Sequence, residues 1–351
     1  MNLSPETRET KIRAFLENGT SSGKAVVPLL LNCLNTLEEP ISQSVDYLDS
    51  DACFTSMKID PYWPKWNSPW WHMTLLYEMG LANRIPYKAL ELLQQALDGY
   101  LHFFPATEEE IPEGRDPIAD ILCQCALGTA HRILLANDVQ IDQKHPWIRE
   151  WFVRYQLADG GYNCDEAAYA KPNGKSSMIS TIHIMESLLA HSHDLSESEI
   201  AALDRSAEYV LQRKLFRSLT TPDRIIDPDW AKLTFPRFYE IDILRSLQCI
   251  LRWSLLRNKP LQFSAIEEVC DIVHSKYGSD LQLRIEREFF SSTDTRIRNA
   301  DGSWQTKQPI SVFPLLSLVG KIDQPSPFLT HSAANMWQDL EKLINLKLLE
   351  F

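Results

Sequence analysis

The spacing of apolar residues constrains this chain more than any other feature of its sequence. Across most of the 351 residues they recur every three to four positions, the period of a helix with one buried face. Only 12 residues are glycine, so the periodic segments are seldom interrupted. We therefore expect an all-α protein with no convincing strand apart from 281–288. The predicted helices are 4–17, 24–37, 68–80, 86–104, 116–137, 145–156, 175–192, 196–215, 235–258, 264–278 and 332–351.

End signals support several of these boundaries. Ser4 is placed as an N-cap before an acidic first turn, and Gly19 follows the first segment in the position of a helix stop. Ser196 and Glu199 have the spacing of a capping box. No long linker rich in Pro, Gly or Ser divides the chain, so we expect one domain over 1–351, of which 1–50 could form an N-terminal helical extension.

The charge balance limits the class of partner. The sequence has 35 basic and 47 acidic residues, a net charge of -12 that argues against nucleic acid or an anionic membrane as the main partner. No stretch reaches the roughly 18 apolar residues of a membrane span, and the first residues do not read as a signal peptide. Seven cysteines without framework spacing fit reduced thiols. We expect a cytoplasmic protein with a small-molecule ligand that is apolar or a glycan; partner proteins are not specified by the sequence.

The segment "REWFVRYQLADGGY" (149–162) combines aromatic residues, Gln156, Gly160 and a second aromatic, Tyr162. A weaker echo, "ADGSWQ", stands at 300–305. The pattern resembles the Gln-Trp repeat of the squalene cyclase and protein prenyltransferase superfamily, and more narrowly the stand-alone bacterial prenyltransferase and squalene oxidase repeat proteins. This resemblance implies an α/α toroid, a ring of inner and outer helices. Gln156 would hydrogen bond exposed backbone groups at a neighbouring helix end and stack on the later aromatic.

The acidic motifs of that superfamily are missing from the sequence. No Asp-x-Asp-Asp acid and no Asp-Asp-x-x-Asp metal motif occurs, because the carboxylates of "DYLDSD" (46–51) have other spacings. Asp51 and Cys53 match the zinc pair of protein prenyltransferases only trivially, and they lie near the N-terminus. The resemblance therefore implies a fold without specifying a reaction.

Four residues are candidate catalytic groups. Asp165 and Glu166 follow the repeat turn directly, and two carboxylates on such a loop can act as acid and base when burial raises one pKa. The alternative is that they cap the next turn or pair with a lysine in solvent. His183 shares a helix face with Glu186, either as a general base or as a core pair. Glu240 is a further carboxylate, expected on a helical stripe with leucines, whereas a surface ion pair with Arg245 would account for Asp242.

Aromatic residues predict the substrate-binding wall. Ten residues are tryptophan, and four of them fall within "WPKWNSPWW", where they could form an aromatic wall or simply fill the core. His72 shares a stripe with apolar residues, which also favours a buried position. The candidate substrate-binding residues are Trp63, Trp66, Trp70, Trp71, His72, Tyr162 and Arg237.

Several cysteines and histidines are potential metal ligands, and their spacing on a predicted helix indicates whether they could bind one ion. Cys123, Cys125 and His131 fall on one predicted helix, where residues two apart point to nearly opposite sides, so we expect them not to hold one ion. Cys164, Asp165 and His183 could assemble a site, but their spacing does not require one. We expect no cofactor and no metal, with zinc as the alternative.

Three functions remain open, in this order. The first is a squalene cyclase or prenyltransferase-like enzyme that acts on an isoprenoid or other apolar substrate in a central aromatic cavity by carboxylic-acid catalysis. It predicts a deep apolar pocket with a raised carboxylate pKa. The second is a carbohydrate-active enzyme with two carboxylates across a cleft. The third is a non-catalytic scaffold whose central cavity is plugged by side chains.

Overall fold

The computed structural model describes residues 4–99, 123–165, 168–169, 173–191, 193–290 and 292–351. Helices dominate the described part, which confirms the all-α class. The longer ones are α1 (Pro5–Thr36), α2 (Glu38–Leu48), α3 (Asp51–Ile59), α4 (Pro69–Glu78), α5 (Tyr87–Gly99), α6 (Gln124–Leu135), α8 (Trp147–Arg154), α9 (Met178–Ala190), α10 (Glu197–Gln212), α11 (Ile243–Arg257), α12 (Phe263–Ser275) and α14 (Pro327–Asn345). The short ones are α7 (Ile141–Lys144) and α13 (Pro314–Val319).

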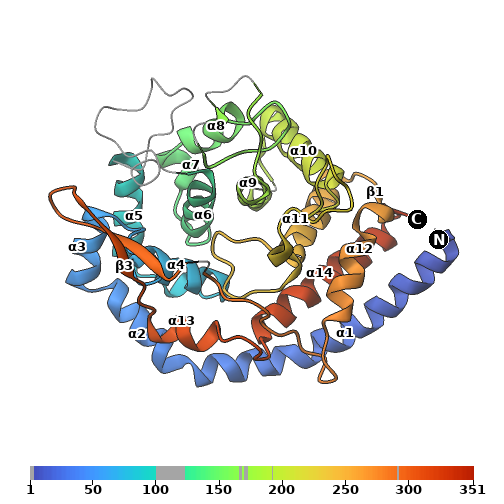
Figure 1. The fold of residues 1–351 in the computed structure, drawn as a ribbon, viewed down its shortest axis with the longest axis horizontal. Helices are drawn as coiled ribbons and strands as arrows, with labels where there is room; N and C mark the ends of the chain where they lie inside the picture. Colours follow the sequence, from blue (N-terminus) through green and yellow to red (C-terminus); the bar gives the residue numbers. More distant parts are fainter. Residues whose placement is uncertain (1–3, 100–122, 166–167, 170–172, 192, 291) are drawn as a thin grey trace.

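Five helices surround the middle of the molecule in chain order. Helices α4, α6, α9, α11 and α14 each contact the next, and α1, α5, α8, α10 and α12 lie outside them (Figure 1). The irregular segment between α10 and α11 runs inside this arc (Figure 1). The inner helices therefore turn their inward faces toward a common centre. None of the described helices combines the length and apolarity that a membrane crossing requires.

Helix α1 is longer than its end signal predicts. Gly19 does not stop the helix, which continues through Pro28 to Thr36. A Cβ atom at Gly19 would lie 2.5 Å from the indole ring of Trp337, and one at Gly23 would lie 3.3 Å from the Cβ of Ala334. These glycines therefore allow α1 to approach α14 closely, because a larger residue at Gly19 would collide with that ring.

The predicted capping signals are confirmed where they depend on local contacts. The Ser4 hydroxyl accepts a hydrogen bond from the backbone N–H of Thr7. Ser196 and Glu199 form both halves of the capping box of α10. Each cap uses residues three positions apart, so the local sequence is enough to specify it.

The segment that contains Gln156 ties α8 to α10. The Gln156 amide donates to the carbonyl oxygens of Gly160 at 2.8 Å and Ala202 at 2.7 Å, and its oxygen accepts from Arg205. Tyr162 is fully buried, and its hydroxyl donates to the carbonyl of Phe152 at 2.7 Å. The turn therefore has a structural role, in which a side-chain amide satisfies backbone carbonyls.

Replacing Gly160 by Ala is expected to lower the free energy of unfolding by about 3 kcal/mol. Gly160 has φ +93°, and an added Cβ would lie 2.7 Å from the carbonyl oxygen of Arg205. Gly302→Ala is the matched control, because φ is +84° there but nothing lies within 4 Å. We expect about 1 kcal/mol for the control, measured by urea denaturation. Equal losses at the two positions would show that the close approach to α10 is unimportant.

The echo at 300–305 is not a second helix-to-helix tie. It forms the turn between β2 (Asp294–Arg298) and β3 (Trp304–Pro309), which pair as an antiparallel hairpin. Asp301 and Gly302 occupy this turn, and the Asp301 carboxylate accepts from the backbone N–H of Ser303. The same Asp-Gly dipeptide suits a hairpin, so the motif alone could not distinguish the two structures.

The predicted strand at 281–288 is wrong, since that segment contributes only an isolated bridge at Arg284. The other strands, β1 (Leu261–Gln262) and β4 (Leu349–Glu350), form a short parallel pair.

Candidate functional site

A cavity of about 490 Å³ lies between the inner helices, and its polar lining is unusually charged. Every inner helix contributes to that lining: Glu78 at the end of α4, Arg132 from α6, Glu186 from α9, Arg245, Gln248 and Arg252 from α11, and His331, Ser332 and Asn335 from α14. Arg237 joins them from the segment before α11. Four arginines and two glutamates thus line the described part of this cavity, although the whole chain is acidic.

The rest of the lining is apolar, and several of its residues adjoin the polar ones in sequence. The apolar lining residues are Leu30, Leu34, Tyr77, Met79, Leu81, Phe235, Phe328 and Leu329. The rings of Phe235 and Phe328 stack with their centroids 4.7 Å apart. The cavity is therefore amphipathic, which differs from the apolar aromatic cavity expected from the sequence. None of the four tryptophans predicted to line it does so.

Glu186 is held between two arginines. Its carboxylate accepts two hydrogen bonds from Arg245, at 2.9 and 2.7 Å, and lies 2.6 Å from the Arg132 guanidinium. Burial alone would raise the pKa of Glu186, but the two guanidiniums hold it well below its usual value. Glu186 is therefore a fixed negative charge, which keeps both arginines in place at the cavity wall.

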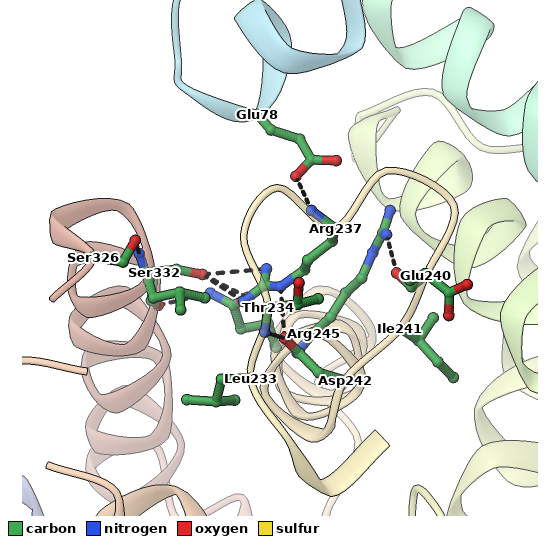
Figure 2. Close-up of polar contacts among 12 residues, drawn as sticks. Glu78, Leu233, Thr234, Arg237, Glu240, Ile241, Asp242, Arg245, Ser326 and Ser332 are labelled. Carbon is green, nitrogen blue, oxygen red and sulfur yellow. Dashed lines mark hydrogen bonds and ion pairs between the residues drawn. The ribbon is translucent and has the colours of Figure 1, made fainter. Parts of the chain in front are cut away.

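Glu78 is the second carboxyl at the cavity. Its oxygens accept from the backbone N–H groups of Arg237 at 2.7 Å and Phe238 at 2.6 Å, the first of which is drawn in Figure 2. Burial raises the pKa of Glu78, while Arg245 and these N–H groups act in the opposite direction. Of the two lining carboxyls, Glu78 is thus the one closer to a protonated state at neutral pH.

The segment before α11 is not helical, which corrects the predicted helix start at 235. Asp242 is the N-cap of α11 and accepts from the backbone N–H of Arg245 at 2.8 Å. It is fully buried and pairs with Arg237 at 3.0 Å, so it does not form the expected surface ion pair with Arg245 (Figure 2). The Arg245 guanidinium instead donates to the carbonyls of Phe238 and Glu240 and so holds this segment inside the arc.

Two arginines of the cavity have donor groups that are only weakly used within the described chain. The terminal nitrogens of Arg237 reach the Ser332 hydroxyl at 3.4 and 3.5 Å, beyond the ordinary length of such a bond (Figure 2). Arg252 is exposed, and its Nε lies 3.8 Å from Asp339. These two guanidiniums can therefore donate to a ligand without giving up strong internal bonds.

The four predicted catalytic residues are not brought together. Asp165 is exposed and lines neither this cavity nor the tryptophan cavity described below, and Glu166 lies outside the described residues. Glu240 is half-buried in the segment before α11, 3.8 Å from Arg287, and burial raises its pKa. It does not continue a helical stripe of leucines, because α11 begins only at Ile243.

His183 is fully buried behind the Glu186 pair. Its Nε2 bonds to the carbonyl of Tyr239 at 3.0 Å, and its Nδ1 lies 3.2 Å from Arg132. Burial lowers the pKa of His183 well below the ordinary value, and the neighbouring arginines add to this effect. A neutral imidazole that accepts from Arg132 at Nδ1 fits these contacts, so His183 supports the cavity wall from behind.

The predicted aromatic wall divides between a second cavity and the core. Trp63 and Trp66 line a separate cavity of about 400 Å³ together with Lys65 and Tyr239. Trp70 and Trp71 are buried in the core, as is His72, which stacks on Phe313 with centroids 3.6 Å apart. Burial lowers the pKa of His72 to about 3. Of the predicted binding residues, Arg237 alone lines the charged cavity described above.

The sequence interpretation missed Glu78, Arg132 and Arg252, and it treated Arg245 only as a surface partner. Glu78 and Arg132 are each an isolated charge on a mostly apolar helical segment, whereas Arg245 and Arg252 lie seven residues apart on one helix and more than 100 residues from Arg132. A charge on the apolar face of a predicted helix was the available signal. No local motif connects the four, because only the arrangement of the inner helices places them together.

Two groups of potential metal ligands occur among the described residues. One is Cys123, Cys125 and Cys164, and the other is His131, Asp142 and His191. The prediction that Cys123 and Cys125 point to nearly opposite sides of one helix is wrong. Cys123 is an extended N-cap that precedes α6 and does not lie on it. His131 belongs to the second group, so it does not join these cysteines.

No protein-family model and no curated protein matches the sequence. Two solved structures show similarity, both of the type II terpene cyclase MstE from Scytonema. A variant in complex with its substrate geranylgeranyl dihydroxybenzoate is 12% identical, with coverage of 89% of this chain and 98% of that chain and a TM-score of 0.26. The apo structure is 13% identical, with coverage of 88% and 99% and a TM-score of 0.25. At such low scores, function has to be inferred from this chain's own residues.

Proposed function

We propose that the chain is an α/α toroid whose central cavity binds, and acts on, an amphipathic small molecule with an anionic head and an apolar body. The observation that carries this proposal is the mixed lining of the cavity, in which all five inner helices contribute polar side chains, four of them charged ones, beside aliphatic and aromatic side chains. An isoprenoid diphosphate or an isoprenoid acid has this constitution. A ligand of this kind fits the cyclase-like or prenyltransferase-like function expected from the sequence. The site is more polar than that function led us to expect.

The excess of arginine favours an anion over a neutral sugar. Arg237 and Arg252 have weakly used donors, and a guanidinium fits phosphate or carboxylate oxygens in a planar, two-point geometry. An acidic protein repels anions in general, so these arginines would select a ligand that fits the cavity. Glu78 is the carboxyl we propose as the proton donor, because its pKa is raised at the cavity wall.

The size of the cavity also supports binding over a purely structural role. About 490 Å³ falls within the range of small-molecule sites. A non-catalytic scaffold was expected to have its centre plugged by side chains such as the tryptophan cluster. Trp66, Trp70 and Trp71 are buried, but none of them lines this cavity.

Three probes separate the contributions of head and body: farnesyl diphosphate, farnesol and inorganic pyrophosphate. We expect farnesyl diphosphate to bind at least about tenfold more tightly than either fragment, as measured by titration calorimetry without added metal. Arg252→Gln should weaken farnesyl diphosphate and pyrophosphate by roughly tenfold and leave farnesol unchanged, since it removes a charged donor. Arg224→Gln, an exposed arginine outside the cavity, is the matched control.

Two results would contradict this proposal. One is that none of the three probes binds to the folded protein. The other is that Arg252→Gln and Arg224→Gln bind farnesyl diphosphate as tightly as the unaltered chain. If farnesol binds tightly and the diphosphate adds no affinity, the ligand is wholly apolar, as the first function expected from the sequence predicts.

A further inference from the structure

Three cysteines from two distant segments place their sulfur atoms together. The Sγ atoms of Cys123 and Cys125 are 3.1 Å apart, and those of Cys125 and Cys164 are 3.3 Å apart. Cys123 is the N-cap of α6 with extended backbone (φ -80°, ψ 156°), so its side chain turns back toward that of Cys125. Cys164 follows the Gln156–Tyr162 turn, whose hydrogen bonds to α8 and α10 fix its position. The cluster is thus held at both ends by ordered structure.

Hydrogen-bond donors are directed at the sulfur of Cys164. The backbone N–H of Cys125 donates to it at 3.3 Å, and the Ser180 hydroxyl lies 3.1 Å away. Donors of this kind stabilise negative charge on sulfur, as does the N-terminus of the twelve-residue helix α6. These donors are placed to stabilise a thiolate once a metal ion has displaced the proton, whereas in the metal-free protein burial raises the pKa of Cys164.

A lysine whose charge acts on the cluster is the next feature of this region. Lys65 lies in an aromatic surround, 4.8 Å from the ring centre of Tyr239, 5.4 Å from that of Trp63 and 5.9 Å from that of Trp66. Within the described ranges, no hydrogen bond or ion pair to its ammonium group is found. Burial lowers the pKa of Lys65, while Cys123, Cys125 and Glu240 act in the opposite direction. The lysine supplies the positive charge that a group of thiolates requires.

We propose that Cys123, Cys125 and Cys164 bind a zinc ion, with a fourth coordination position left for a water molecule or a ligand atom. Three thiolates and Zn²⁺ have a net charge of one negative unit, which the Lys65 ammonium balances. Each thiol that is still protonated releases its proton to solvent as it binds. This site is separate from the charged central cavity and does not depend on the function proposed for it.

The geometry requires a small adjustment of the side chains. Tetrahedral zinc with Zn–S bonds of about 2.3 Å separates its sulfur ligands by about 3.8 Å, so the thiols must move apart by about 0.5–0.7 Å. Rotation about the Cα–Cβ bonds is enough for such a shift. A disulfide would instead join two sulfurs at about 2.05 Å and leave the third thiol unused.

The second group of potential ligands is a poorer cation site. His131 Nε2 lies 3.2 Å from His191 Nε2, and the remaining ring nitrogens contact Ser187 and Asp142. These contacts form one continuous hydrogen-bonded chain. Arg149 adds a positive charge 3.4 Å from the Asp142 carboxylate, which disfavours a metal ion there.

Metal content of the full chain tests the cysteine proposal. Protein purified under reducing conditions with zinc, and then dialysed against a weak chelator, is expected to retain about one zinc ion per chain. Cobalt substitution should give sulfur-to-cobalt charge-transfer absorption in the near ultraviolet. Cys164→Ser should reduce zinc retention to below about one third of that value and weaken this absorption, because it removes one of three thiolates. Cys33→Ser is the matched control, since that thiol is also partly buried but lies on α1.

Zinc retention that is absent, or equal in Cys164→Ser and Cys33→Ser, would overturn the proposal. A chain mass lower by two hydrogens in the unreduced protein, with no bound metal, would show a disulfide in place of the zinc site. Circular dichroism of Cys164→Ser shows whether the variant is still folded when it loses the metal. If Cys164→Ser does not fold, Cys123→Ser is the second variant.

Discussion

Glu186→Gln is expected to lower the free energy of unfolding by about 3 kcal/mol. The carboxylate of Glu186 contacts both Arg132 and Arg245, whose side chains are 8% and 5% exposed. Glutamine has the same shape but no charge, so Arg132 and Arg245 would remain buried without the carboxylate that contacts them both. Urea denaturation at pH 7 measures the difference, with the m-value as a check that the unfolded state is unchanged.

The pH dependence of this effect has a defined sign. The pKa of Glu186 is lowered in the folded chain, so its contribution is fully present above the unfolded value of 4.5 and is lost as the pH falls below it. The difference between the unaltered chain and Glu186→Gln should therefore shrink below about pH 4.5. Glu208→Gln is the control, an exposed glutamate whose carboxylate accepts a hydrogen bond from Gln212. A difference that stays constant down to pH 3 would exclude the ion pairs as its cause.

The helices could be predicted largely from the sequence because their signals are local. The period of the apolar residues gives the class, and caps such as Ser4 and the pair Ser196 and Glu199 depend on residues three positions apart. The errors arise where tertiary contacts decide. Gly19 ends no helix, because it accommodates Trp337, and the segment before Ile243 is irregular, because Arg245 binds its carbonyls.

The candidate site was less predictable than the fold. Arg237 and the pair His183 and Glu186 were identified on the sequence, but the expected roles of that pair are reversed in space. Glu186 lines the cavity as a fixed charge, whereas His183 is buried behind it. A helical stripe places residues on a common face without showing which of them reaches the centre. The charges opposite Glu186 come from α6 and α11, more than 50 residues away along the chain in each direction.

Asp242 connects the helix start and the cavity, so Asp242→Ala is expected to have the second large effect, about 3–4 kcal/mol. The substitution removes the N-cap of α11 and leaves Arg237, which is 12% exposed, without its carboxylate. Ser326→Ala is the matched control, because Ser326 is a buried N-cap of α14 whose hydroxyl accepts from the backbone N–H of Leu329 and pairs with no arginine of the described ranges. We expect about 1 kcal/mol for that control, measured by the same urea denaturation.

Combining Asp242→Ala with Arg237→Met separates the cap from the ion pair. If most of the loss comes from an uncompensated guanidinium, the double variant should recover about 1–2 kcal/mol relative to Asp242→Ala, because methionine can pack where the charge could not. It should also bind farnesyl diphosphate more weakly than the unaltered chain, since Arg237 would no longer face the cavity. A double variant that regains stability but still binds farnesyl diphosphate weakly would show that Arg237 affects stability through its ion pair with Asp242 and binding through its donors to the ligand. A double variant no more stable than Asp242→Ala would mean that the cap accounts for the whole loss.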